Sequence, residues 1–263
     1  MKLNFDKYQG TGNDFIIVDD RIGVWEAKLD RARIAALCDR RFGIGADGLM
    51  LLAQHQDADF RMIYFNSDGN ESTMCGNGGR CLVDFAHQQG VIGQIAAFEA
   101  IDGMHQAIWS PTVVRLKMMN PRGYRPIDSQ QDWIDTGSPH HLVWSDDSLS
   151  LIDLQHAGSS IRYSARYAPG GTNVNFIHPI SDTALSVRTY ERGVEGETFS
   201  CGTGVTACAY VHLLKQEVTN GLVQINTPGG ELSVEIHHLG QEQEEVWLIG
   251  PATFVFSGSI DIL

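Results

Sequence analysis

The same order of predicted elements occurs twice in this chain, and this repeat is the strongest constraint on its fold. Residues 59–65, DFRMIYF, alternate like a strand and lead through a polar loop into MCGNGGRC at 74–81, where a helical pattern follows. Residues 184–190, ALSVRTY, lead in the same way into SCGTGVTAC at 200–208 and a second helical pattern. Two copies of one unit predict two similar domains.

Each copy continues beyond its helix into a predicted hairpin and a closing strand. The first hairpin turns at Asp102-Gly103 and the second at Gly229-Gly230, and both turns separate alternating runs. The closing strands end at Pro121 and Pro251. We therefore predict an α+β fold of two structurally similar domains, each a strongly bent sheet or open barrel around a central helix.

The repeat also sets the expected domain boundaries. The first domain is expected to span 1–120 and to carry Cys75, and the second to span 121–251 and to carry Cys201. The last strand, at about 252–263, is expected to cross back to the first domain. We place the linker between Pro121 and Asp135.

Charge and hydropathy exclude several classes of partner. The 263 residues carry a formal net charge of −13, without a run of Lys or Arg, so we expect no nucleic-acid partner and no docking on anionic membranes. No apolar run approaches the roughly 18 residues that a membrane span needs. Residues 1–20 alternate like a strand and show no signal-peptide pattern, so we expect a cytoplasmic protein.

The five cysteines do not form a disulfide pattern, because an odd, sparse set in a chain of this length is typical of free thiols in a reducing compartment. Cys38, Cys81 and Cys208 lie on apolar helical faces and are expected to pack in the core. The spacings from Cys75 to Cys81 and from Cys201 to Cys208 differ from zinc knuckles, so we expect no metal site.

Cys75 and Cys201 each precede a predicted helix in a glycine-rich turn. The unpaired N–H groups at a helix start bind anions and lower the pKa of a nearby thiol. Two such turns that face each other would hold one carboxylate and place a thiol on either side of its α-carbon. One thiolate could then remove the α-proton while the other thiol delivers a proton, with no cofactor required. A metal site and a redox dithiol remain the alternatives.

The motifs that carry these residues are similar to those of the diaminopimelate epimerase family. The matching stretches cover nearly the whole chain in family order: GTGNDF (10–15), RRFGIGADG (40–48), FNSDGNESTMCGNGGRC (65–81), GTNVNF (171–176) and YERGVEGETFSCGTG (190–204). The resemblance implies two domains related by a pseudo-twofold axis, a homodimer, no cofactor and a small-molecule amino-acid substrate. Family members interconvert LL- and meso-diaminopimelate, a step towards lysine and peptidoglycan.

The resemblance also implies roles for individual residues. Cys75 and Cys201 would be the catalytic thiols, and His140 would hold the reacting ammonium group or tune a thiol. The remaining matched positions would bind the substrate: Asn13, Asn66, Gly76, Asn77, Asn173, Glu191, Arg192, Gly202 and Thr203. Arg192 can hold a distal carboxylate through two hydrogen bonds, and Glu191 can accept a hydrogen bond from a distal ammonium group.

Two positions depart from the family pattern. Ser138 stands where many members have Asn, and Gly48 stands where some have Gln. Two other functions fit the same cysteines: a proline-racemase-like epimerase of the same fold, and a non-catalytic protein for thiol redox or ligand binding. Glu191, Arg192 and the asparagines favour diaminopimelate, because a substrate without a second amino-acid end has no use for them.

Overall fold

The computed structural model describes residues 1–262, and the chain divides into two compact units. Unit 1 comprises Met1–Leu116 and the segment from Gly250 onwards, and unit 2 comprises Lys117–Ile249. No helix among residues 1–262 combines the length and the apolar character that crossing a membrane requires.

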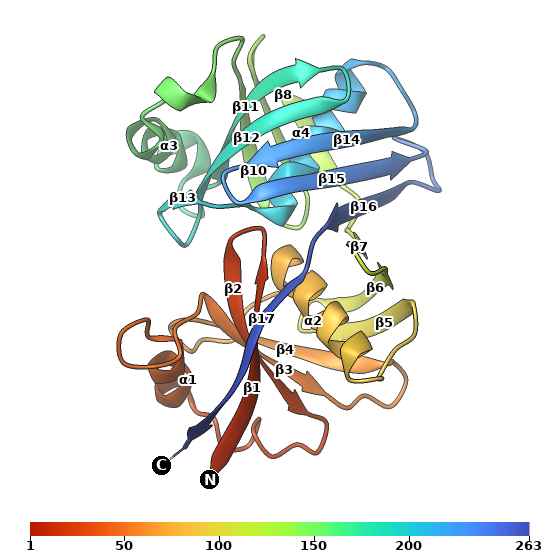
Figure 1. The fold of residues 1–263 in the computed structure, drawn as a ribbon. Coiled ribbons are helices and arrows are strands. Elements are labelled where there is room, and N and C mark those ends of the chain that lie inside the picture. Colours follow the sequence, from red (N-terminus) through yellow and green to blue (C-terminus); the bar gives the residue numbers. More distant parts are fainter. Residues whose placement is uncertain (263) are drawn as a thin grey trace. The chain divides into compact units, whose positions relative to one another are not determined.

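Unit 1 is a mixed sheet with two helices (Figure 1). Its elements are, in chain order, β1 (Lys2–Gly10), β2 (Asn13–Asp20), α1 (Arg31–Cys38), β3 (Gly48–Ala53), β4 (Phe60–Asn66), α2 (Gly76–Gln88), β5 (Ile95–Ala100), β6 (Gly103–Trp109), β7 (Val114–Lys117) and β17 (Thr253–Asp261). Neighbouring strands pair in the order β17–β1–β2–β3–β4–β5–β6–β7.

Unit 2 is also a mixed sheet, and its strands surround helix α4. Its elements are β8 (Arg122–Pro126), β9 (Gln131–Asp135), β10 (Pro139–Trp144), η1 (Leu149–Leu151), α3 (Leu154–Arg162), η2 (Ala165–Tyr167), β11 (Asn173–Ser181), β12 (Ala184–Glu191), β13 (Gly196–Thr198), α4 (Gly202–Lys215), β14 (Gly221–Thr227), β15 (Gly230–His237) and β16 (Glu245–Gly250). The sheet runs β8–β9–β10–β11–β12–β14–β15–β16, and β13 also pairs with β12.

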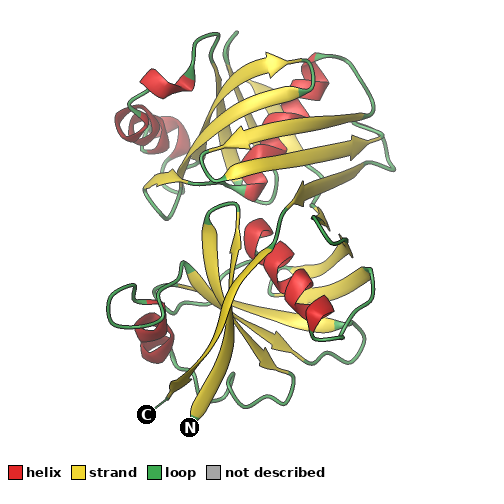
Figure 2. Ribbon diagram, viewed as in Figure 1, coloured by secondary structure: helices red, strands yellow, loops and turns green. Residues whose placement is uncertain are grey.

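Both units contain the same crossover, a strand followed by a helix and then a strand parallel to the first. Helix α2 joins β4 to β5, and α4 joins β12 to β14. Each helix is largely buried, because strands of its own unit pack around it (Figure 2). The predicted α+β fold, with a bent sheet around a central helix in each half, is confirmed.

The expected linker between Pro121 and Asp135 is wrong. Residues 122–135 form the hairpin β8–β9 within unit 2, and the chain passes between the units at Leu116–Lys117. Asp132 is fully buried in this hairpin and accepts hydrogen bonds from Tyr124 (3.1 Å) and Trp144 (2.6 Å). Two of its partners, Trp144 and Lys215, lie outside this hairpin, so the local sequence alone resembles an exposed polar connection.

Candidate functional site

The candidate residues of unit 1 lie at one edge of its sheet. Asn13 begins β2, Gly48 begins β3 and Asn66 ends β4. Strand β3 is parallel to β2 and antiparallel to β4, so these three positions fall together; Gly48 is paired with Phe15 on one side and Asn66 on the other. The turn from β4 then leads to Gly76, the first residue of α2.

The candidate residues of unit 2 have the same arrangement within their own sheet. His140 lies at the start of β10, Asn173 begins β11, Glu191 ends β12 and Gly202 begins α4. His140 pairs directly with Asn173 in the parallel register. Each unit thus collects strand ends and one helix N-terminus at a single edge.

Cys75 and Cys201 are the N-cap residues of α2 and α4. Both have extended backbones, with φ/ψ of −93°/126° and −124°/112°, and neither thiol caps the first turn of its helix. Because neither side chain occupies the amide groups of the first turn, those groups can face an anion. Cys75 is half-buried, and Cys201 is 8% exposed.

Helix α2 begins earlier than the sequence pattern indicated. The hydropathy pattern predicts a helix that follows the glycine-rich turn, whereas Gly76, Asn77, Gly78 and Gly79 already form its first turn. Gly79 N–H already donates to the carbonyl of Cys75 (2.7 Å). Glycine carries no apolar side chain, so hydropathy gives no signal for this turn.

A series of polar contacts connects Cys201 to residues of β10, β11 and β12 in the same unit. The Cys201 sulfur lies 3.5 Å from Thr203 Oγ1, which lies 3.0 Å from His140 Nε2. His140 Nδ1 lies 3.0 Å from Asn175 Nδ2, and Asn175 Oδ1 accepts from Thr189 (3.0 Å). Asn175 Nδ2 also donates to the carbonyl oxygen of His141 (3.4 Å), which fixes the nitrogen end of this amide towards His140.

This geometry determines the tautomer of His140. Its Nδ1 faces an amide donor and must accept, so the proton lies on Nε2 and is donated to Thr203. The Thr203 hydroxyl is then oriented to donate to the Cys201 sulfur. Burial, reinforced by the charge of Arg192, lowers the pKa of His140 to about 3, so the imidazole is neutral near pH 7. His140 is fully buried, and its connection to the Cys201 thiol runs through Thr203.

Close packing at the start of α4 depends on Gly204. A Cβ atom at this position would lie 2.4 Å from Asn175 Oδ1 and 3.3 Å from the Cys201 sulfur. A side chain at 204 would therefore displace the amide that orients His140. The fourth residue of the Cys-Gly-Thr-Gly turn is thus constrained by sterics.

Ser138 lies among the residues expected to bind the substrate. Its Oγ accepts from Asn173 Nδ2 (2.9 Å) and lies 3.4 Å from Arg192 Nη2. Asn173 Oδ1 in turn accepts from the backbone N–H of Arg192 (2.8 Å). Glu191 accepts from Thr198 (2.8 Å). The shorter serine still contacts both neighbours, and the Arg192 side chain is exposed.

The second departure, Gly48, has a steric reason. A Cβ atom here would lie 2.5 Å from the carbonyl oxygen of Phe65 and 2.5 Å from the Tyr64 ring. The Tyr64 side chain lies over the backbone of Gly48, so a glutamine cannot enter without moving β4. In this chain the Tyr64 ring therefore occupies the space next to Gly48.

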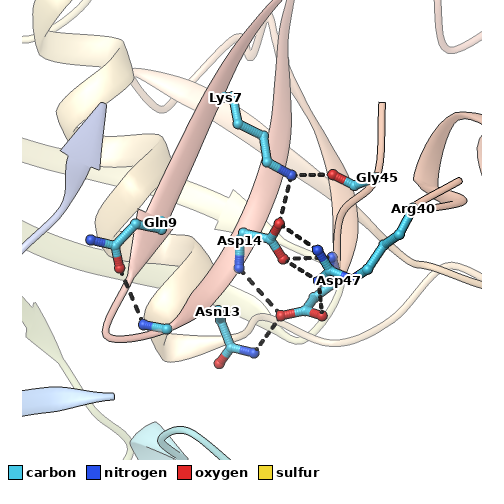
Figure 3. A network of polar contacts seen from close by, with 8 residues as sticks. Lys7, Gln9, Asn13, Asp14, Arg40, Gly45 and Asp47 are labelled. Carbon is cyan, nitrogen blue, oxygen red and sulfur yellow. Dashed lines mark hydrogen bonds and ion pairs between the residues drawn. The ribbon is translucent and has the colours of Figure 1, made fainter. Parts of the chain in front are cut away.

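In unit 1, Asn13 and Asn77 are joined in a larger polar network, and Figure 3 shows its part around Asn13, Asp14 and Asp47. Asn77 Nδ2 donates to Asn13 Oδ1 (2.5 Å), and Asn13 Nδ2 donates to Asp47 (3.0 Å). Arg40 bridges Asp14 and Asp47 at 2.6 and 2.8 Å. Burial opposes the ionisation of Asp14, but hydrogen bonds and charge from Arg40 and Lys7 prevail and lower its pKa to about 2.

The remaining cysteines are buried free thiols. Burial raises the pKa of Cys38 and of Cys81 to about 12, and raises that of Cys208 well above its usual range. Such thiols stay protonated and unreactive at neutral pH.

Several residues that contact the predicted set were missed by sequence reasoning. They are Thr11, Asp47, Arg80, Thr136, Asn175 and Thr189. Four of them, Thr11, Asp47, Arg80 and Asn175, lie inside the matching motifs, and that position was the available signal. Their side-chain partners come from other strands, which the sequence alone does not pair.

Solved structures of low sequence identity share this fold. A phenazine biosynthesis protein of the PhzF family from Bacillus anthracis matches with a TM-score of 0.77 and 14% identity, covering 100% of both chains. A hydroxyproline epimerase from Agrobacterium vitis matches with a TM-score of 0.69 and 17% identity, covering 98% of this chain and 92% of that one. The fold is thus one found in epimerases and in PhzF-family proteins.

Sequence comparison narrows this class to one family. The family model for diaminopimelate epimerase matches residues 5–109 and 133–255. The diaminopimelate epimerase of Flavobacterium psychrophilum is 48% identical, over 97% of this chain and 98% of its own length. That of Chlorobaculum tepidum is 42% identical, over 96% and 99%. The chain belongs to the diaminopimelate epimerase family and is an isomerase, which confirms the resemblance of its motifs.

Proposed function

We propose that this protein interconverts LL- and meso-2,6-diaminopimelate without a cofactor, through Cys75 and Cys201. The observation that carries the proposal is the matched position of these residues, each the N-cap of a helix that its own thiol does not cap. The names of the relatives support the substrate. The reaction would serve lysine and peptidoglycan precursor synthesis.

The proposed chemistry balances with two thiols. One cysteine, as thiolate, takes the α-proton and becomes a thiol, while the other gives its proton to the opposite face and becomes a thiolate. The N–H groups of the first turns, at Gly76, Asn77, Gly202 and Thr203, would stabilise the charge that develops on the carboxylate. The roles of the thiols exchange when the reaction runs in reverse.

The thiol of Cys201 has further support in unit 2. Because neutral His140 donates to Thr203, the Thr203 hydroxyl can donate a hydrogen bond to the Cys201 thiolate. A hydrogen bond to the charged form lowers the pKa of a thiol. His140 would thereby tune the thiol from a buried position, as a positioning residue.

The other polar residues of the candidate site would bind the distal amino-acid end of the substrate. Arg192, exposed and held at its backbone by Asn173, can bind a carboxylate with two hydrogen bonds. Glu191 can accept from an ammonium group. Asn13 and Asn66, at the strand ends of unit 1, would add amide donors and acceptors for the substrate. A substrate without these groups would leave their partners unpaired.

Solvent deuterium provides the test of this proposal. In deuterated water, LL-diaminopimelate should give meso product with one deuterium at the inverted α-carbon, because the proton delivered comes from an exchangeable thiol. Mass spectrometry and NMR of the product would show it. Product without solvent deuterium would contradict the two-thiol mechanism, and equal turnover of proline or hydroxyproline would contradict the substrate.

We further infer that the enzyme works in the cytoplasm as a homodimer. Strand β17 presents Phe254, Val255 and Phe256 at 44–52% exposure, and an exposed apolar run of this kind is typical of an interaction surface. Analytical ultracentrifugation should give twice the chain mass. A monomer at micromolar concentration would exclude the dimer.

A further inference from the structure

Arg80 is the largest side chain that is fully buried in the structure. Its guanidinium binds four neutral oxygens: Thr11 Oγ1 (3.0 Å), Asn77 Oδ1 (3.1 Å), and the carbonyls of Pro251 (3.3 Å) and Gly76 (3.4 Å). Within residues 1–262 no carboxylate lies in ion-pair distance of it. A buried charge without a counter-charge is costly to keep, so its retention calls for a functional reason.

The first consequence of this guanidinium is the orientation of two amides. Arg80 can only donate, so it fixes Asn77 with its oxygen inwards and its nitrogen towards Asn13. Asn13 in turn points its nitrogen at Asp47, which can only accept. Figure 3 shows the Asp47 end of this chain. Asn77 and Asn13, both proposed to bind substrate, are thus hydrogen-bonded in series between the Arg80 guanidinium and the Asp47 carboxylate. Each amide therefore has its oxygen on the Arg80 side and its nitrogen on the Asp47 side.

The second consequence is electrostatic. Arg80 lies one turn beyond Gly76 and binds its carbonyl, so its charge adds to the partial positive charge at the start of α2. Burial lowers the pKa of Arg80, and the charges of ionised Cys81 and Cys75 oppose that shift. The guanidinium therefore favours an anion at either sulfur, and only Cys75 is at the helix start.

The other titratable side chains near the first turn of α2 are few, and most of them are neutral or acidic. Asp102 accepts from the N–H of Met74 (3.4 Å) and from His105 (3.2 Å) at the β5–β6 hairpin. On α2 itself are Cys81, Asp84 and, in its last turn, His87, and Tyr8 of β1 faces Asp84. The two carboxylates oppose an anion at Cys75, and His105 is paired with one of them.

We propose that Arg80 is a positioning residue for the reaction, which orients Asn77 and favours the thiolate form of Cys75. This inference rests on the proposed function of Cys75, but its test does not depend on turnover. In a Cys201→Ala background, Cys75 is the thiol that reagents can reach, because Cys38, Cys81 and Cys208 are buried.

The experiment measures alkylation of Cys75 by iodoacetamide against pH, read by peptide mass spectrometry. Arg80→Met and Arg80→Gln remove the charge and should raise the thiol pKa by about one unit, which lowers the alkylation rate at pH 7 about tenfold. Arg80→Lys keeps the charge and should stay within about threefold of the parent. Arg40→Met is the matched control: it removes an exposed arginine from the Asp47 end of the same network and should leave the profile unchanged.

A separate readout tests the orientation of Asn77. With Cys201 present, Arg80→Lys should lower kcat/KM about tenfold while the thiol pKa stays, because lysine cannot hold Asn77 and Thr11 together. An unchanged Cys75 profile in a neutral Arg80 variant that still unfolds cooperatively would overturn the proposal. A shifted profile would support it even if the deuterium experiment failed, so the two proposals fail independently.

Discussion

Cys75→Ala and Cys201→Ala will each lower kcat for diaminopimelate epimerisation by at least about 1000-fold. On the proposed mechanism, each variant lacks the group that serves one face of the α-carbon, so a proton removed on one side has no donor on the other. Both variants should still bind substrate, because the helix N–H groups remain. Turnover assays in both directions, with binding followed by calorimetry, would measure the two effects separately.

The chain offers matched controls in the same two helices. Cys81→Ala and Cys208→Ala remove buried thiols whose raised pKa keeps them protonated, so kcat should stay within about threefold. These controls should instead lower the melting temperature, since each removes buried volume from the core. Normal epimerisation by Cys75→Ala or Cys201→Ala would remove that residue from the mechanism.

Arg192→Met will lower kcat/KM for diaminopimelate by about 100-fold, chiefly through a higher KM. On the proposed role of Arg192, the variant loses two charge-assisted hydrogen bonds to the distal carboxylate, an interaction expected both before and during the chemical step. Arg192 is exposed and bears no core packing, so the melting temperature should hardly change. Steady-state kinetics and thermal unfolding of the same preparation would show both results.

Arg122→Met is the matched control for this substitution. Arg122 is an exposed arginine of unit 2, and its nearest carboxylate, Asp135, is 3.9 Å away. The same chemical change there should leave kcat/KM within about twofold. A loss of kcat at unchanged KM in Arg192→Met would instead place Arg192 near the reacting centre and contradict its role at the distal end.

The two-unit α+β fold was predictable because its signals are local. Alternating strands, the hairpin turns at Asp102-Gly103 and Gly229-Gly230, and the repeated Cys-Gly turns each occupy a few consecutive residues. The first turn of α2 and the hairpin β8–β9 were not recovered. Glycine residues show no apolar periodicity. The buried Asp132 is stabilised by contacts with Trp144 and Lys215, which lie outside the hairpin.

In the candidate site, too, the features with local sequence signals were predictable and the contacts between distant residues were not. Motifs identified the side chains that could meet a substrate, but the groups that orient them were not apparent. His140 lies beside Asn175 because β10 and β11 run in parallel, and Asn175 meets Thr189 because β12 returns antiparallel. Arg80 was visible in the CGNGGRC motif, yet its burial and neutral partners follow from packing against Thr11 and Pro251. Registers between strands decide these contacts, and no local pattern encodes them.

The pairing of β1 with β17 has a consequence for how the chain acquires its structure during translation. The register runs from Lys2 opposite Asp261 to Gln9 opposite Thr253, so unit 1 needs both its earliest and its latest segments. Unit 2 is continuous, from Lys117 to Ile249, and can form while the final strand is still inside the ribosome. Until that strand emerges, β1 exposes an unpaired edge that other nascent chains could pair with. The N-terminal half of this enzyme is therefore the half that most needs chaperone protection.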